Sequence, residues 1–328
     1  MIRIYITDYI TSPDIEQNIF GSSVNIECGN TENENDFPNS IEAADALLVW
    51  HAKITKKTID RLKNCKIIVR YGTGYENVDF QYAREKGIPF CNTPDYGIDE
   101  VADTACSMIL ALTRKIFTYN YSAQNYQSGW QEHTLKPISR SNKHKLGIIG
   151  IGRIGSTVAL RMKAFGMDIG FYDPYVVSGY EKTLGVKRFD TIDELLKHAS
   201  IISIHTPLTE ETNGMVDRKF IDQLNPNTIF VNTARGKIVS NLNALYDGLK
   251  NGQLEGVGLD VLPTEPPVDS EYLIQAWKNE DSDLYSKIII TPHTAYYSDL
   301  AWVEMRSKTA ENANRVLHGG TPKNLIVE

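Results

Sequence analysis

A glycine-rich turn is the feature that most restricts the fold of this chain. The stretch LGIIGIGRIGSTVALRMKAFG places Gly150, Gly152 and Gly155 between an apolar run and a helical pattern. A strand that ends at the first glycine and a helix that begins at once require an α/β arrangement. There Gly150 permits the tight turn, Gly152 lets a ligand approach the backbone, and Gly155 lets helix and strand pack closely. The N–H groups at the helix N-terminus then suit phosphate groups.

The run that follows indicates which phosphate ligand fits this turn. IGFYD ends in Asp173, 18 residues beyond Gly155. A carboxylate near this spacing accepts hydrogen bonds from the ribose hydroxyls of adenosine and repels a 2′-phosphate. The pattern therefore predicts a site for NAD rather than NADP. The alternative is a glycine turn in an α/β domain that binds no ligand.

Six strand-like runs alternate with helical patterns in the second half of the chain. They are 146–150, 169–173, 201–205, 228–232, 256–261 and 287–291. Thr191 with Glu194 predicts a capping box at one helix, and Ser240 is expected to cap another that ends near Gly252. Six strands with five connections is the number in a complete doubly wound dinucleotide fold.

A similar alternation runs from the N-terminus to about residue 95. Its strand candidates are 2–7, 46–50, 66–70 and 88–91, with helical patterns at 55–64 and 79–87. A second parallel sheet is expected from them. Residues 99–117 predict one continuous helix, apolar enough to be buried between domains or subunits, and 124–145 predict an irregular loop. The amphipathic helix at 301–320 is expected to return to the first domain.

Composition excludes several classes of function. The chain has 328 residues, 41% hydrophobic and 23% charged, which is ordinary for a globular protein of two domains. The net charge of −7 without a basic cluster argues against a nucleic-acid partner. No apolar run is long enough to span a bilayer, which argues against a membrane partner. The four cysteines lack metal-ligand spacing, and no export signal is apparent. We therefore expect a cytoplasmic protein without a metal.

Three charged groups follow predicted strand ends. Arg235 follows IFVN, Glu265 lies in the loop after GVGLD, and His293 comes directly after KIIITP. Loops at the carboxyl ends of parallel strands open toward the ligand crevice. A guanidinium grips a carboxylate, and an imidazole oriented by a carboxylate moves a proton near neutral pH. Beside a hydride acceptor, this set suits interconversion of a 2-oxo acid and a 2-hydroxy acid. For each residue alone, a loop charge or a structural histidine is the alternative.

The sequence resembles the D-isomer-specific 2-hydroxyacid dehydrogenase family over nearly its whole length, through GIIGIGRIG, FYDPY, HTPLTEET, FVNTARGKIV, GVGLDVLPTEPP and ITPHTA. The resemblance implies that His293 is the general acid in reduction, that Glu265 supports it, and that Arg235 binds and polarises the substrate. It implies cofactor contacts at Arg153, Ile154, Thr206, Pro207, Thr233, Ala234 and Asp260, the last with the nicotinamide carboxamide. Backbone N–H groups around Gly72, Thr73 and Gly74 are implied to receive the substrate carboxylate.

The resemblance also implies the architecture. A flavodoxin-like substrate domain, 1–98 with 296–328, and a Rossmann NAD domain, 99–295, are expected to place the active site in the cleft between them. Family members are usually homodimers joined through their cofactor domains, so a homodimer is expected. A small 2-oxo or 2-hydroxy acid is the expected partner.

Within the family, PDYGIDEVADTACSMILALTRK and TPHTAYYSDLAWVEMR are most similar to the branch of C-terminal-binding-protein-like and phosphoglycerate-dehydrogenase-like bacterial members. Asp103-Thr104 stands where many relatives carry Glu-His, which weakens a D-lactate or phosphoglycerate assignment. Five residues have two interpretations: they form an aromatic wall for a larger or aromatic 2-oxo acid, or they simply pack in the interior. They are Tyr71, Tyr75, His51, Tyr296 and Tyr297. An NAD(H)-sensing, corepressor-like binding protein is the alternative to an NAD-dependent dehydrogenase. The complete arginine, glutamate and histidine set favours the enzyme.

Overall fold

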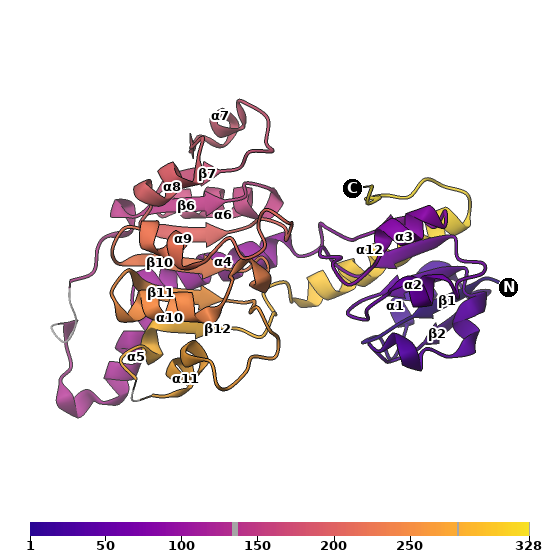
Figure 1. The fold of residues 1–328 in the computed structure, drawn as a ribbon, viewed down its shortest axis with the longest axis horizontal. Helices are drawn as coiled ribbons and strands as arrows, with labels where there is room; N and C mark the ends of the chain where they lie inside the picture. The colour runs from indigo at the N-terminus through magenta and orange to yellow at the C-terminus, as the bar shows by residue number, and fades with distance from the viewer. Residues whose placement is uncertain (133–136, 281, 328) are drawn as a thin grey trace. The chain divides into compact units, whose positions relative to one another are not determined.

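The chain forms two compact units in a computed structural model that describes residues 1–132, 137–280 and 282–327 (Figure 1). The first unit comprises Met1–Gly97 with Tyr297–Glu328, and the second comprises Ile98–Tyr296. Each unit contains one parallel sheet, so the predicted fold class of two doubly wound α/β domains is confirmed. Among the described residues, no helix is both long and apolar enough to cross a membrane.

Five parallel strands form the sheet of the first unit, in the order β2-β1-β3-β4-β5. They are β1 (Arg3–Ile6), β2 (Asn25–Cys28), β3 (Ala46–Val49), β4 (Ile67–Arg70) and β5 (Phe90–Cys91). Strand β3 is buried along its whole length, as parallel strands covered on both faces are. Strand β2 is not among the predicted strands, because Asn25 and Glu27 interrupt its apolar pattern at the sheet edge.

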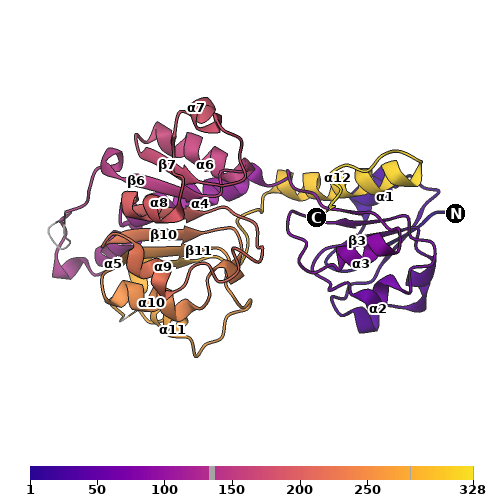
Figure 2. The same cartoon turned by 45° about the horizontal axis from the view of Figure 1, so that its top comes forward.

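Four helices accompany this sheet, and the last comes from the far end of the chain. They are α1 (Asp14–Phe20), α2 (Lys56–Ile59), α3 (Phe80–Glu85) and α12 (Asp299–Leu317), with 3₁₀ turns at Glu34–Asp36 and Asn39–Ala43. Helix α12 lies against α1 and β4 (Figure 2). Helix α2 is shorter than the predicted 55–64, because Lys63 N leaves the helical path and donates to Glu42 O at 3.2 Å.

The sheet of the second unit has seven parallel strands in the order β12-β11-β10-β9-β6-β7-β8. They are β6 (Lys145–Ile149), β7 (Asp168–Tyr172), β8 (Lys187–Arg188), β9 (Ile201–Ile204), β10 (Thr228–Asn232), β11 (Leu254–Leu259) and β12 (Ile288–Ile290). The six predicted strands are all present, and the seventh, β8, is a two-residue edge strand without an apolar residue. The strand order reverses between β6 and β9, where a doubly wound sheet opens a ligand crevice.

Eight helices surround the second sheet in the described residues. They are α4 (Ile98–Thr113), α5 (Ile116–Gln124), α6 (Arg153–Ala164), α7 (Tyr180–Leu184), α8 (Ile192–His198), α9 (Arg218–Gln223), α10 (Leu242–Lys250) and α11 (Tyr272–Lys278), with 3₁₀ turns at Tyr126–Ser128, Ser141–Lys143, Gly236–Ile238 and Tyr285–Lys287. Thr191 caps α8 as predicted, since Glu194 N donates to its hydroxyl at 3.3 Å. The predicted cap Ser240 is wrong by one residue: Asn241 has the extended backbone of an N-cap and accepts from Ala244 N at 3.2 Å.

The predicted continuous helix at 99–117 is wrong at its C-terminal end. Helix α4 ends at Thr113, and α5 begins at Ile116 after Lys115 adopts a left-handed conformation with φ of 52°. The Lys115 ammonium contacts the Glu255 carboxylate, which ties this break to the neighbouring strand. In the predicted loop 124–145, residues 133–136 lie outside the described residues.

The buried face of α4 packs on the sheet of its own unit. A Cβ at Gly258 of β11 would stand 3.1 Å from Met108 Cβ, and one at Gly256 would stand 2.8 Å from Leu112 Cδ2. Met108 and Leu112 belong to an apolar cluster of the second unit. The expected burial of α4 between domains or subunits stays a prediction.

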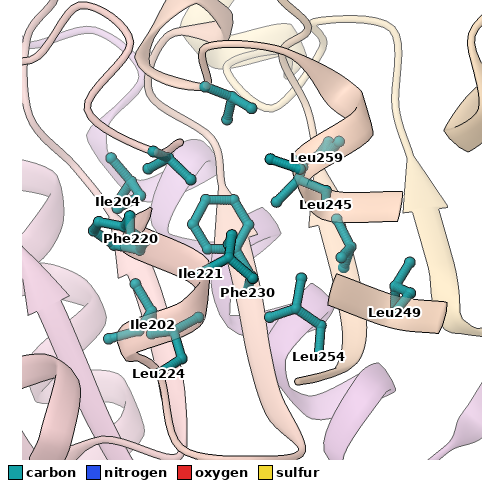
Figure 3. Packing of buried hydrophobic residues seen from close by; sticks show 14 of the residues in the cluster. Ile202, Ile204, Phe220, Ile221, Leu224, Phe230, Leu245, Leu249, Leu254 and Leu259 are labelled. Carbon is teal, nitrogen blue, oxygen red and sulfur yellow. The ribbon is translucent and has the colours of Figure 1, made fainter. Parts of the chain in front are cut away.

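The opposite face of the sheet carries the largest apolar cluster of the second unit. Figure 3 shows Phe230 of β10 among side chains from β9, β11, α9 and α10, including Ile202, Phe220, Leu245 and Leu254. Burying each such side chain contributes roughly 1.5–3 kcal/mol. The core therefore fixes the carboxyl ends of β9, β10 and β11, from which the candidate site is built.

Candidate active site

The glycine turn after β6 forms a cradle at the point where the strand order reverses. Gly150 has φ of 89°, and a Cβ there would stand 2.7 Å from His205 O. A Cβ at Gly155 would stand 2.1 Å from Gly150 O, so only glycine allows α6 to approach the strand. At Gly152 a Cβ would meet nothing within 4 Å, and no side chain caps α6. The open space and the free helix N-terminus fit a pyrophosphate.

Polar groups without a partner among the described residues lie beside this turn. They are the hydroxyls of Thr206 and Thr233 and the Nδ1 atom of His205, all buried after β9 and β10. Burial lowers the pKa of His205 to about 3, so the ring is neutral, and its Nε2 lies 2.8 Å from Ser203 Oγ. Buried polar groups normally have partners, so these three fit a polar ligand such as a dinucleotide.

The other residues expected at the cofactor lie in the turn or directly after strands of the same sheet. Arg153 and Ile154 begin α6, Pro207 follows β9, and Ala234 N donates to Asn232 Oδ1 at 3.0 Å after β10. The Asp173 carboxylate follows β7, accepting from Ile151 N and from Tyr175 N, both at 2.9 Å. It therefore stands at the turn, and its bond to ribose stays a prediction.

His293 and Glu265 are in direct contact. His293 Nδ1 lies 2.8 Å from Glu265 Oε2, and Leu262 N donates to Glu265 Oε1 at 2.8 Å. Burial alone would raise the pKa of Glu265. The hydrogen bonds from His293 and Leu262 and the charge of Arg235 outweigh that effect and lower it. The carboxylate is thus ionised at neutral pH and holds an N–H on Nδ1, which leaves Nε2 to face a substrate.

Arg235 is brought to this pair by the loop after β10. Asn232, buried at the end of β10, donates from Nδ2 to Arg235 O at 2.9 Å and fixes the turn. The next residue, Gly236, lies so near the following loop that a Cβ would stand 1.9 Å from Leu262 O. Three loops at adjacent strand ends thereby collect the guanidinium, the carboxylate and the imidazole in one unit.

Asp260 holds the loop that carries His293. Its carboxylate, 2% exposed, accepts from Thr291 Oγ1 at 2.6 Å, Thr294 N at 2.9 Å and Ala295 N at 3.0 Å. His293 has φ of 55°, an unfavourable conformation for a non-glycine residue, and its N–H donates to Asp260 O at 2.8 Å. Sequence reasoning assigned Asp260 to the cofactor alone and missed both this role and Asn232. Their signal was a polar side chain at the end of an apolar, buried strand.

The loop expected to receive the substrate carboxylate lies in the first unit, after β4. Gly72 has φ of 108°, and a Cβ there would stand 2.0 Å from Arg70 Nη1. The carbonyls of Gly72 and Thr73 accept from Thr93 N at 3.0 Å and Asn92 Nδ2 at 2.7 Å. No acceptor in the described residues takes the N–H groups of Gly72, Thr73 or Gly74, which suits them to a carboxylate.

The five aromatic candidates divide into two groups. Tyr71 is fully buried and donates to Glu16 Oε1 at 3.0 Å, and Tyr75 packs on Phe80 and Phe90, so packing explains these two. His51 and Tyr297 are exposed, and Tyr296 is half-buried.

One described group offers clustered metal-ligand atoms, all within 4.8 Å of one another: Asp8, Glu32 and His51. The expectation of no metal stays a prediction.

Comparison with known proteins gives consistent similarities. The family pattern for "D-isomer specific 2-hydroxyacid dehydrogenase, NAD binding domain" matches residues 106–295. The chain is 34% identical over 327 residues to D-3-phosphoglycerate dehydrogenase of Methanocaldococcus jannaschii, and 32% identical over 290 residues to C-terminal-binding protein 1 of Caenorhabditis elegans. These matches cover 99% and 87% of this chain but only 59% and 38% of the two relatives. D-Lactate dehydrogenase from Aquifex aeolicus, solved with NAD and lactic acid, matches with a TM-score of 0.82 and 29% identity over 96% of each chain.

Proposed function

The chain belongs to the D-isomer-specific 2-hydroxyacid dehydrogenase family, with NAD as its cofactor, and from this premise we propose that it interconverts a 2-oxo acid and a D-2-hydroxy acid. The observation that carries the proposal is the 2.8 Å contact between His293 Nδ1 and Glu265 Oε2 beside Arg235. A proton-transfer group, its orienting carboxylate and a carboxylate-binding cation are what this reaction needs from the protein.

NAD, when bound, supplies the hydride acceptor or donor. His293 then handles the proton: in reduction its Nε2–H gives a proton to the substrate oxygen, and in oxidation Nε2 takes one back. Glu265, kept ionised, stabilises the imidazolium and fixes the ring through Nδ1. Arg235 binds the substrate carboxylate and polarises the neighbouring carbonyl. The N–H groups of Gly72, Thr73 and Gly74 are proposed to bind the same carboxylate.

The test of this mechanism is the His293→Ala variant. We expect kcat to fall by roughly two to four orders of magnitude, the usual effect of losing a general acid. NADH affinity should stay within about twofold, because the glycine turn is untouched. His318, an exposed histidine after α12, provides the control variant His318→Ala with unchanged turnover. Wild-type turnover in His293→Ala would remove this residue from the mechanism.

An NADH-oxidation screen tests the activity itself. The panel contains pyruvate, hydroxypyruvate, glyoxylate, branched-chain and aromatic 2-oxo acids. Reduction of at least one of them is expected. The second candidate is an NAD(H)-responsive binding protein, favoured by the 32% identity to C-terminal-binding protein 1 of Caenorhabditis elegans. Tight NADH binding with no reduction of any 2-oxo acid would support that candidate.

We also propose a homodimer joined through the second unit. Large apolar side chains are exposed in and just after α5: Ile116 at 55%, Phe117 at 47%, Tyr126 at 61% and Trp130 at 67%. Grouped apolar exposure of this kind marks a protein interface. Light scattering should give twice the chain mass, and Phe117→Glu should yield monomers. A wild-type monomer at micromolar concentration contradicts this proposal. A cytoplasmic location, and the expected lack of nucleic-acid and membrane partners, stay predictions.

A further inference from the structure

The carboxyl edge of the first sheet contains a second group of functional candidates. The order β2-β1-β3-β4-β5 reverses between β1 and β3, and a crevice for ligands forms at such a reversal. The loops after β1 and β3 carry Tyr9, Trp50 and His51. The loop after the neighbouring strand β4 carries Gly72, the start of the proposed carboxylate site.

Aromatic rings from the loops after β1 and β3, from α12 and from the segment just before α12 pack together at this edge. Tyr9 lies 4.7 Å from His51 and 5.4 Å from Trp50, measured between ring centroids. Trp302 of α12 lies 5.1 Å from Trp50, and Tyr297 lies 6.2 Å from Trp302. We call these five residues the aromatic platform. Trp50 is buried, whereas Tyr9 and Tyr297 are each 61% exposed, so the outer rings offer their surfaces to a ligand.

The platform is held rigidly by a buried carboxylate. Asp8, 2% exposed, accepts from the N–H groups of Trp50, His51 and Ala52 at 3.3, 2.7 and 3.3 Å. Tyr9 is held with φ of 64°, which a tyrosine adopts only at a conformational cost. A strained residue that presents an exposed ring is more typical of a ligand site than of a packing surface.

The platform adjoins the loop proposed to hold the substrate carboxylate. The Trp50 ring lies 5.6 Å from the ring of Tyr71, the residue directly before Gly72. A 2-oxo acid whose carboxylate is bound by the N–H groups of Gly72, Thr73 and Gly74 therefore has its side chain beside the platform. Stacked rings bind a planar aromatic group through offset or edge contacts.

Charge at the same place excludes anionic side chains. The carboxylates of Asp8 and Glu32 lie within 4.8 Å of each other and of His51. These two acids place negative charge next to His51, which disfavours a phosphate or a second carboxylate there. We propose that the aromatic platform selects 2-oxo acids with an uncharged aromatic side chain and rejects those that carry a phosphate or a second carboxylate. This inference rests on the proposed dehydrogenase function and names its substrate class.

The test compares kcat/KM with NADH for phenylpyruvate, pyruvate, oxaloacetate and 3-phosphohydroxypyruvate. We expect kcat/KM for phenylpyruvate to be at least tenfold higher than for pyruvate, and at least a hundredfold higher than for oxaloacetate or 3-phosphohydroxypyruvate. Tyr9→Asn tolerates the left-handed backbone. It should lower kcat/KM for phenylpyruvate about tenfold and for pyruvate less than twofold. Trp302→Leu should act in the same direction. Glu32→Gln should raise kcat/KM for oxaloacetate several-fold.

The control is Tyr272→Asn, which removes a tyrosine of similar exposure (58%) from α11 and should change no substrate preference. Preference for pyruvate or for an anionic substrate, or equal losses on phenylpyruvate and pyruvate in both platform variants, would overturn the inference while the dehydrogenase function stands. If no 2-oxo acid is reduced, the proposed function fails. Binding of phenylpyruvate to the NADH-loaded protein then tests whether the aromatic platform binds an aromatic 2-oxo acid. Quenching of tryptophan fluorescence by phenylpyruvate, weakened by Tyr9→Asn, would support it, and no binding would overturn it.

Discussion

The two units follow one plan but differ at the edge where each sheet reverses its strand order. In the second unit, β6 passes through a turn with Gly150 and Gly152 straight into α6, whose first turn contains Gly155 and no acidic residue. In the first unit, residues 7–13 separate β1 from α1, and the first turn of α1 carries Asp14 and Glu16. At the first edge, the N–H groups of the loop after β3 already bind the Asp8 carboxylate.

This difference shows what topology decides and what it leaves open. In both units the strand order reverses, and the carboxyl edge at such a reversal is where doubly wound sheets bind ligands. The residues at that edge then set the ligand chemistry: free N–H groups and glycines suit phosphates, whereas a buried acid and stacked rings do not. Substitutions that act on one unit and spare the other test the distinction.

The largest effect on NADH binding is expected at Gly155. An alanine Cβ would stand 2.1 Å from Gly150 O, so Gly155→Ala must displace α6 from β6. We expect NADH affinity to fall about 100-fold, or about 2.8 kcal/mol. Overpacking should also destabilise the second unit by about 1–3 kcal/mol. Calorimetric titration with NADH and hydrogen exchange resolved by unit measure the two effects.

Gly152→Ala is the matched control at the same turn. Its Cβ meets nothing within 4 Å, and its φ of −67° suits any residue, so stability should not change. NADH affinity should still fall, because the methyl group occupies the space left for the pyrophosphate. Equal stability losses in both variants would contradict the assignment of that space to a ligand.

The largest effect on stability alone is expected at Arg306 in the first unit. Its guanidinium, 7% exposed, bonds to the buried Glu16 with Nε–Oε1 at 3.0 Å and Nη2–Oε2 at 2.5 Å. Arg306→Met leaves Glu16 buried without its cation, which should destabilise this unit by about 3–5 kcal/mol. NADH affinity should stay unchanged. Urea unfolding, followed separately in each unit by hydrogen exchange, checks the result.

Lys63→Met serves as the control, because Lys63 pairs with Glu42 at 2.6 Å on the surface of the same unit. An exposed pair of this kind contributes less than about 1 kcal/mol. A comparable loss of stability in both variants would contradict the importance of burial for the Arg306–Glu16 pair. A loss of NADH affinity in Arg306→Met would show that the two units are not independent.

Sequence patterns predicted the interior strands of both sheets and the edge strands β5 and β12, but missed the edge strands β2 and β8. Strands such as β9 and β10 are continuous apolar runs, which burial on both faces requires. Strands β2 and β8 pair on one side only, so their sequences need no such signal. The helix break at Lys115 depends on a cation in contact with Glu255, a residue 140 positions away. Such a contact cannot be read from local pattern.

For the candidate site, the sequence likewise predicted which residues matter but not how they contact one another. Strand ends directed attention to Arg235, Glu265 and His293, because polar residues after buried strands stand out. The 2.8 Å contact between Glu265 and His293 and the bonds of Asp260 to residues 291–295 depend on loop conformation, which only the structure provides. The aromatic platform likewise joins Tyr9, Trp50 and Trp302, three positions far apart in the sequence. The catalytic and binding roles of all these residues stay predictions.

The smallest expected effect is a difference in acid sensitivity. Burial lowers the pKa of His205 in the second unit to about 3, and burial also lowers the pKa of His144 and His198. An unfolded histidine titrates near pH 6.5, so below that pH the unfolded state binds more protons than the folded state. For His205, its contribution to stability is therefore full above pH 6.5 and is lost as the pH falls toward 3; the lowered pKa values of His144 and His198 act in the same direction.

In the first unit, Asp8 responds at lower pH. Burial alone would raise its pKa, but hydrogen bonds from His51 and Thr7 lower it below the usual value of 3.8, so its contribution is lost only under stronger acid. Without cofactor, hydrogen exchange between pH 6.5 and 4.5 should show the second unit losing stability faster than the first. His205→Gln should reduce the pH dependence of the second unit's unfolding free energy by the contribution of His205. An unchanged pH dependence would mean that the His205 ring is protonated in the folded protein. Water would then reach the edge beside the glycine turn, although His205 Nδ1 is buried and has no partner among the described residues.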